Sequence, residues 1–126
     1  MTTGTTPHHD RSIEQVLRCY SLVDSGDVPA LVDLFTDDVT YHRPGYQPIV
    51  GRDAFERFYR AVRMIREGEH IVDTLLAADA KVAVHGRFHG VLHDGKHVDL
   101  RFADFFVVED DGRISRRDTF FFAPLV

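Results

Sequence analysis

The stretch Val98–Val108, with the sequence VDLRFADFFVV, decides the fold of this 126-residue chain. Side chains of a strand alternate between two faces, so Phe102, Asp104 and Phe106 share one face. The stretch therefore predicts a long strand whose apolar face carries a carboxylate. Burial removes water from a carboxylate and favours its protonated form unless a cation or a hydrogen-bond donor compensates. Asp104 is therefore either part of a structural ion pair or a tuned acid/base group.

Composition and charge limit the classes of protein that the chain can belong to. A net charge of −5 argues against a nucleic-acid-binding protein, which normally carries a clustered basic face. The single cysteine, Cys19, excludes an internal disulfide and fits a reducing compartment. The apolar runs are too short to span a bilayer, and the chain does not open on a signal-peptide pattern. We expect a cytoplasmic domain that binds neither nucleic acid nor membrane.

The first half of the chain has the spacing of apolar residues that predicts three helices. Ser12 and Gln15 form a capping-box pattern for the first helix, and Gly26 ends it. We expect residues 1–11 to form a disordered tail and residues 12–126 to form a single domain. The remaining elements of this half are a helix capped by Asp27, a strand over 39–42, a loop over 43–48 and a helix opened by Gly51.

The second half of the chain predicts strands joined by tight turns. The turn signals are Asp94-Gly95 and Asp110-Asp111-Gly112. The expected strands cover residues 70–77, 81–92, 97–109 and 113–122. Three helices followed by a meander of long antiparallel strands are typical of an α+β fold in which one curved sheet wraps over the helices.

Short motifs spread along the chain support this architecture. They are LVDSGD at 22–27, LFTDDVT at 34–40, GRDAF at 51–55 followed by Phe58-Tyr59, and DGRI at 111–114. This series resembles the superfamily of nuclear transport factor 2, ketosteroid isomerase and SnoaL-like polyketide cyclases, from about Ile13 to Phe122. The resemblance implies a cone-shaped α+β fold, with three N-terminal helices packed on one strongly curved, mostly antiparallel sheet. Function does not follow from the fold, because this fold hosts enzymes, binding modules and transport factors.

The resemblance to ketosteroid isomerases places this chain's residues at three functional positions. Asp104 falls where those enzymes keep a buried, protonated aspartic acid. The general-base position is occupied by Arg43, which cannot abstract a proton near neutral pH because its pKa stays above about 12. The oxyanion-binding tyrosine would fall at Cys19, with Tyr20 one residue along. The resemblance therefore argues against steroid isomerisation by that mechanism.

The resemblance to SnoaL-like cyclases implies a different set of roles. Those enzymes use an aspartate at the Asp104 position as acid/base, helped by a histidine on the preceding strand, which here corresponds to His89. They need no metal or organic cofactor, and they close a ring by removing a proton alpha to a carbonyl. The resemblance thus implies that Asp104 and His89 are catalytic. Arg43 or Arg87 would hold the oxyanion or an acidic substituent of the substrate.

Two placements stay open in the sequence. His85, Arg87 and His89 share one face of their strand, and that face could line the cone or face outward, toward solvent or a dimer interface. Either Arg116 or Arg117 could pair with Asp104 or clamp a substrate, because a bulge would move either side chain across the sheet.

Several other side chains are candidates for substrate binding. Tyr20 and Tyr59 either belong to the core or donate to a developing oxyanion, and His42 and Tyr46 either line the cone's mouth or anchor a loop. Eight histidines invite a metal site, but without an HxxxH helix or a CxxC pattern we expect none. The full set of expected substrate-binding residues is Tyr20, His42, Tyr46, Tyr59, His85, Arg87, Phe102, Arg117 and Phe121.

The function expected from this reasoning is that of a cofactor-independent enzyme. It would act by acid/base catalysis on a small hydrophobic, carbonyl-bearing substrate, as a cyclase, isomerase or dehydratase. One alternative is a non-catalytic module that binds a small ligand or a partner. Another is an epoxide hydrolase, whose second carboxylate would be Asp73. Phe105 and Val107 on the outer face of the sheet predict a homodimer, because they would otherwise expose apolar area.

Overall fold

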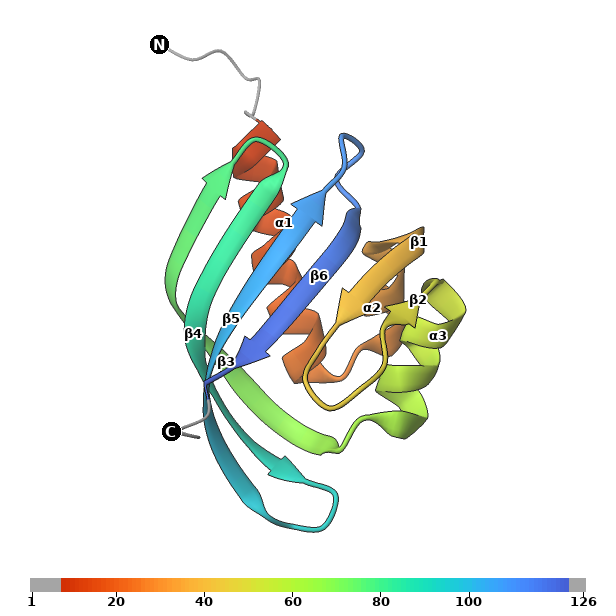
Figure 1. The fold of residues 1–126 in the computed structure, drawn as a ribbon, viewed down its shortest axis with the longest axis vertical. Coiled ribbons are helices and arrows are strands. Elements are labelled where there is room, and N and C mark those ends of the chain that lie inside the picture. The colour runs from red at the N-terminus through yellow and green to blue at the C-terminus, as the bar shows by residue number, and fades with distance from the viewer. Residues whose placement is uncertain (1–7, 123–126) are drawn as a thin grey trace.

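Helices cover one face of a six-stranded sheet, whose long strands bend along their length (Figure 1). The structure, a computed structural model, describes residues 8–122. The elements in this range are α1 (His8–Ser25), α2 (Val28–Asp33), β1 (Phe35–His42), β2 (Ile49–Val50), α3 (Arg52–Arg57), the π-helical turn η1 (Phe58–Val62), β3 (Ile65–Ala78), β4 (Lys81–Leu92), β5 (His97–Val108) and β6 (Ile114–Phe121). The predicted α+β class, with helices on one curved and mostly antiparallel sheet, is confirmed.

The sheet has the strand order β2-β1-β6-β5-β4-β3, and only the β1–β6 pair among these strands is parallel. β5 lies inside the sheet and places Asp104 between Val84 on β4 and Thr119 on β6. The helices cover the inner face of the sheet, and the core fills the space between them (Figure 1). The fully buried core side chains include Val16, Phe35, Val39, Phe55 and Ile114. None of the helices within residues 8–122 has the length and apolar character needed to span a bilayer.

The first helix differs from the prediction at its start. α1 begins at His8, so Ser12 lies inside the helix and is buried, and the expected capping box is wrong. Gln15 instead donates a hydrogen bond of 2.7 Å from Nε2 to the Gly112 carbonyl oxygen in the β5–β6 turn. The expected tail falls partly on residues 1–7, which lie outside the described residues. The predicted end of the helix is confirmed, because Gly26 follows Ser25 with a φ of 74°.

Two strands begin earlier than their sequences indicate. β1 starts at Phe35, directly after α2, so the acidic pair at 37–38 belongs to the strand. β3 starts at Ile65 and pairs along nearly its whole length with β4. Its first half lies beside a bulky ring: a Cβ on Gly68 would be 2.2 Å from Cζ of Phe88. The glycine therefore leaves room for Phe88 to lie across the neighbouring strand, where a strand-favouring side chain would clash.

Candidate active site

Asp104 is the acceptor of a buried hydrogen-bond network. Its side chain is fully buried, and Oδ2 accepts a hydrogen bond of 2.6 Å from the Tyr20 hydroxyl and one of 3.0 Å from Nη2 of Arg117. Oδ1 accepts a hydrogen bond from Thr119 Oγ1, on the strand paired with β5. Arg117 is only 3% exposed, so this ion pair is also out of water. Three donors, one of which is the cation Arg117, compensate for the lost hydration of the carboxylate.

Tyr20 reaches Asp104 because α1 presents an apolar stripe to the sheet. Cys19, Tyr20 and Val23 are buried at helical spacing. Burial, and then the negative charge of Asp104, raise the pKa of Tyr20, so the phenol stays protonated and donates its hydrogen bond. Burial raises the pKa of the Cys19 thiol to about 12, so this side chain acts as a small buried apolar group.

Arg117 lies among aromatic rings. Its guanidinium carbon is 5.0 Å from the ring centre of Tyr41 and 5.4 Å from that of Phe106. Nη1 donates a hydrogen bond of 3.1 Å to the Tyr59 hydroxyl. Burial is the largest effect and would lower the pKa of Arg117, but Asp104 together with Tyr41, Tyr59 and Cys19 raises that pKa well above its usual value. Arg117 therefore stays charged, and the hydrogen on the Tyr59 hydroxyl remains available to a second acceptor.

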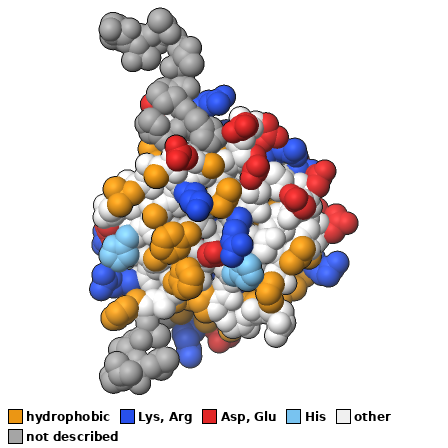
Figure 2. All heavy atoms as spheres, turned by 45° about the horizontal axis from the view of Figure 1, so that its top comes forward, with side chains coloured by type: hydrophobic (Ala, Val, Ile, Leu, Met, Phe, Trp, Pro, Cys, Tyr) orange, Lys and Arg blue, Asp and Glu red, His pale blue; other side chains and the backbone are white. Residues whose placement is uncertain are grey.

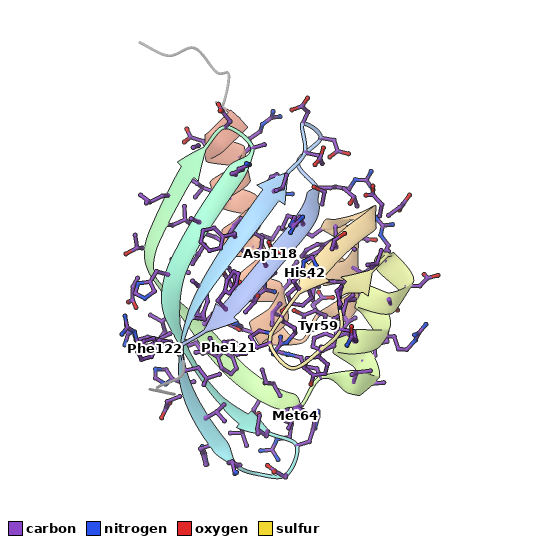
Figure 3. All side chains as sticks on the ribbon, viewed as in Figure 1. His42, Tyr59, Met64, Asp118, Phe121 and Phe122 are labelled. Atoms are coloured by element: carbon purple, nitrogen blue, oxygen red, sulfur yellow. The ribbon has the colours of Figure 1, made fainter. Side chains whose placement is uncertain are left out.

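A narrow cavity of about 20 Å³ lies beside this network, between the sheet and the helices. Its apolar walls come from Val23, Ile65, Phe88, Phe102 and Phe121. Asp104, Arg117 and Thr119 share the polar side of the wall with Arg43, Tyr59, Arg63 and His70. Figure 3 shows Tyr59 between the sheet and α3, and Phe121 at the end of β6. The cavity has room for about one water molecule, so a substrate enters only if side chains at its mouth rotate.

His70 is the one histidine of the described residues that lines this cavity. It lies on β3 opposite Phe88 and its side chain is 9% exposed. Asp24, near the end of α1, accepts two hydrogen bonds from it: 2.6 Å from the ring nitrogen Nδ1 to Oδ1, and 2.8 Å from the backbone N–H to Oδ2. Burial lowers the pKa of His70, against the opposing effect of Asp24. The ring is therefore neutral at pH 7, with its hydrogen on Nδ1 and a lone pair on Nε2.

Arg43 and Arg63 complete the polar part of the lining. The guanidinium of Arg43 lies 5.1 Å from the ring centre of Phe58 and 5.5 Å from that of Phe121, and its Nη1 donates a 2.9 Å hydrogen bond to the Tyr41 hydroxyl. Arg63, directly after η1, lies 5.2 Å from the ring centre of Tyr59. Within the described part of the chain, neither guanidinium has a carboxylate within ion-pair distance.

The SnoaL-like domain family matches residues 16–117, which include every element from most of α1 to the middle of β6. The chain belongs to the SnoaL-like domain family. This SnoaL-like domain is also similar in fold to solved structures. The epoxide hydrolase/cyclase-like enzyme SalBIII, which has a role in pyran ring formation in the polyether salinomycin, aligns over 90% of this chain and 92% of its own, with a TM-score of 0.79 and 23% identity.

Two further structures show the same likeness of fold. An LEH-like epoxide hydrolase of M. tuberculosis aligns over 92% of this chain and 86% of its own, with a TM-score of 0.81 and 20% identity. An NTF2-like protein of unknown function from Burkholderia pseudomallei aligns over 89% of this chain and 91% of its own, with a TM-score of 0.80 and 20% identity. The family match confirms the predicted resemblance to SnoaL-like proteins, and these structures confirm the predicted fold.

The SnoaL-like domain brings together most of the expected site residues. Tyr46 does not line the cavity, but its ring centre lies 5.6 Å from the guanidinium of Arg43. The choice between the two arginines of β6 is also settled: Arg117 pairs with Asp104, and Arg116 pairs with Asp118. The expected residues that line the cavity are Arg43, Tyr59, Phe102, Asp104, Arg117 and Phe121, and Tyr20 donates a hydrogen bond to Asp104 behind the lining.

Four expected site residues lie on the opposite face of the sheet. His89 is bound to Asp99, and Arg87 is bound to Asp73 at 3.0 Å. The expected placement of His89 beside Asp104 is therefore wrong, as is a cavity position for Arg87. His85, on the same face of β4, is exposed as well. The physical reason is the alternation of β4, whose apolar residues occupy the inner face and leave only the outer face to these polar side chains.

His42 is the fourth residue on the outer face. Its Nδ1 lies 2.9 Å from Oδ1 of Asp118, and Figure 3 shows the two side chains next to each other on neighbouring strands. The adjacent Tyr41 points inward and is fully buried, so the strand parity that buries Tyr41 turns His42 away from the cavity. The expectation that His42 lines the mouth is wrong.

Sequence reasoning missed three residues of the site. Thr119 carried a usable signal, because it lies between Arg117 and Phe121 at strand spacing and must share their face. His70 carried none: its strand has a register shift between Val72 and Thr74, which breaks the alternation. Arg63 follows a π-helical turn that changes the direction of the last helical residues. Within residues 10–122, no three His, Cys, Asp or Glu side chains form a group that could hold a metal ion.

Proposed function

We propose that this SnoaL-like domain is a cofactor-independent enzyme that removes a proton alpha to a carbonyl of a small hydrophobic substrate. The reaction would be a cyclisation, an isomerisation or a dehydration. One observation carries the proposal: a neutral histidine backed by a carboxylate lines the same narrow cavity as protonated phenol and guanidinium donors. Groups of these two kinds are the base and the oxyanion donors that enolisation needs.

His70 is the proposed general base. Its Nε2 carries the lone pair, because Nδ1 donates to Asp24 at 2.6 Å. The carbon–hydrogen bond of the substrate breaks, the proton goes to Nε2, and the electron pair moves to the carbonyl oxygen as an enolate. The negative charge of Asp24 stabilises the imidazolium that forms and keeps the ring in its orientation. His70 thus takes the acid/base role that the resemblance assigned to Asp104, and it replaces His89 as the histidine of the site.

Tyr59 and Arg117 are the proposed partners of the enolate oxygen. The pKa of Tyr59 is raised by burial, so its phenol keeps its hydrogen, and it accepts a hydrogen bond from Arg117 at 3.1 Å. A phenol that accepts from a cation is a stronger donor to an oxyanion. Asp104 was expected to shuttle the proton. Because both of its oxygens already accept hydrogen bonds, its proposed role here is to hold Arg117 and Tyr20 in position.

Exchange of carbon-bound hydrogen for deuterium tests the proposal directly. A panel of cyclic ketones that includes 2-tetralone and cyclohexanone is incubated with the protein in D2O, and loss of the alpha-proton signal is followed by NMR. We expect catalysed exchange, reduced at least 100-fold in His70→Gln, as for loss of a general base. His89→Gln is the matched control, because it removes a histidine of the outer face. Undiminished exchange in His70→Gln would exclude the proposed base.

The two alternatives differ in their support. A non-catalytic binding module is favoured by Arg43 at the position of the usual base, and it predicts ligand binding without exchange in the same experiment. The epoxide-hydrolase alternative rested on Asp73 as a second carboxylate. Asp73 lies on the outer face bound to Arg87, so that assignment of the second carboxylate is wrong.

We also propose that the chain forms a homodimer through the outer face of its sheet. Figure 2 shows hydrophobic side chains gathered between arginine or lysine and histidine side chains on one face. The exposed fraction is 51% for Phe105, 55% for Phe120 and 68% for Leu76. An open hollow of about 520 Å³ lies beside them, into which side chains of a second copy could pack. Arg116 and Asp118, an ion pair of opposite charges, line this hollow and suit a self-complementary interface.

A further inference from the structure

The cavity lining carries more positive than negative charge. Among the described residues that line it, Arg43, Arg63 and Arg117 are cations and Asp104 is the one carboxylate. Asp104 is already paired with Arg117 at 3.0 Å. His70 adds no negative charge, and its partner Asp24 is not part of the lining. Two guanidinium groups therefore remain without a compensating anion.

These two guanidinium groups also have unsatisfied hydrogen-bond donors. Nε of Arg43 and Nε of Arg63 are buried and lack hydrogen-bond partners within residues 8–122. Burial lowers the pKa of Arg63, and the positive charges of Arg43 and Arg117 lower it further. A cation that has lost water and faces other cations is unfavourable unless an anion joins it. An anion placed between the two side chains would restore both hydrogen bonds and charge balance.

The pKa of Tyr41 also shows the effect of the positive charges around the cavity. Burial acts to raise the pKa of a tyrosine, yet the pKa of Tyr41 is lowered, because the charges of Arg117 and Arg43 act on it in the opposite direction. Arg43 also donates a hydrogen bond of 2.9 Å to this phenol oxygen. The region between β1 and η1 thus favours negative charge.

We propose that Arg43 and Arg63 bind the carboxylate of an organic acid, whose apolar part extends between Phe121 and Phe88 toward His70. This inference deepens the proposed function, on which it rests, by naming the substrate class of the same cavity. The acid would be a keto acid, since the reaction needs a carbonyl as well. Both arginine side chains are held by ring contacts and one hydrogen bond, so they can rotate to admit it.

The aromatic surroundings of Arg43 indicate an acid with a flat apolar body. The guanidinium lies within 5.1–5.9 Å of the ring centres of Phe58, Phe121, Tyr46 and Tyr41. A guanidinium that is flanked by rings keeps its edge free for a carboxylate, and its fork geometry fits two oxygens. The walls beyond it are apolar, so an unsaturated or aromatic ring fits better than a polyhydroxylated chain.

Calorimetry with a matched pair of probes tests this inference. Phenylacetate carries the proposed anion, and phenylacetamide has the same shape without the charge. We expect phenylacetate to bind about tenfold more tightly or better. Arg43→Gln and Arg63→Gln should each remove most of that preference. Arg57→Gln is the control: it deletes the same charge from an exposed position on α3 and should leave the preference unchanged.

The outcomes separate this inference from the proposed function. Equal binding of the acid and the amide, no binding of phenylacetate at millimolar concentration, or an unchanged preference in both folded arginine variants would overturn it. Ketone exchange without any preference for the acid would leave the proposed function standing alone, and preference for the acid without exchange would indicate a binding module.

Discussion

His70 on β3 and Asp24 on α1 are joined by two hydrogen bonds that end on the same carboxylate. Oδ1 of Asp24 accepts from the imidazole at 2.6 Å and Oδ2 accepts from the His70 backbone N–H at 2.8 Å. The helix thereby fixes both the ring orientation and the strand that carries it. A base that is held at two points needs little reorganisation when it takes a proton.

The first prediction concerns the pH dependence of stability. The pKa of His70 is lowered in the folded protein by burial, and it returns to about 6.5 on unfolding. The unfolded state then binds more protons at acidic pH, so stability falls as the pH drops from about 6.5 through the folded-state pKa. His70→Gln should flatten this part of the curve, as measured by urea midpoints between pH 7.5 and pH 5. His89→Gln should keep the slope; an equal slope in His70→Gln would contradict the prediction.

The second prediction concerns the buried ion pair. Arg117→Met leaves the Asp104 carboxylate without its cation and should cost about 3–5 kcal/mol of unfolding free energy. Asp104→Asn should be similarly destabilised, with loss of the ketone exchange, and the double variant should lose less than the sum. Arg116→Met removes the neighbouring surface pair with Asp118 and should cost less than about 1 kcal/mol. Denaturant titrations measure these changes. Similar losses of unfolding free energy in Arg117→Met and Arg116→Met would contradict the prediction that the buried pair contributes more than the surface pair.

The third prediction concerns the close packing of β4. A Cβ on Gly86 would lie 2.3 Å from the Ile71 carbonyl oxygen and 2.9 Å from Cζ of Phe102. Gly86→Ala should therefore destabilise by about 1–3 kcal/mol through overpacking, although alanine is ordinarily the better strand residue. Thermal unfolding measures the change. His85→Ala, one residue away on the exposed face, should stay within about 0.5 kcal/mol; a stable Gly86→Ala would show that the strand can shift.

The fourth prediction concerns assembly. Light scattering should give a mass of two chains of 14.4 kDa each. Phe105→Asp places a charge in the proposed interface and should shift the mass to one chain, because an unpaired charge there would lose its water. Leu17→Asp alters an exposed apolar residue of α1, on the other layer of the fold, and should leave the mass unchanged. A single-chain mass for the unchanged protein would exclude this dimer.

The fold could be predicted because the spacing of apolar residues in long strands and helices shows which face of each element is buried. The alternation in β5 placed Asp104 inside, and Gly26 and Asp27 marked the boundary between α1 and α2. The site was only partly predictable. Alternation shows which residues share a face of a strand, but it does not show which face is covered. The resemblance placed His89 of β4 on the inner face, although Val84 and Phe88 occupy that face. Distant pairings such as the one between α1 and β3 leave no local pattern.

The polar side chains of the cavity differ in how many hydrogen bonds hold them in the fold. Asp104 binds side chains from α1 and β6, so a change there alters the packing of both layers. Arg43 and Arg63 together make one side-chain hydrogen bond to the rest of the described chain, from Arg43 to the Tyr41 hydroxyl. Substitutions at the mouth can therefore change which molecule is admitted while the chemistry behind it stays assembled. In such a domain, a new specificity can arise by one or two substitutions without a compensating change elsewhere.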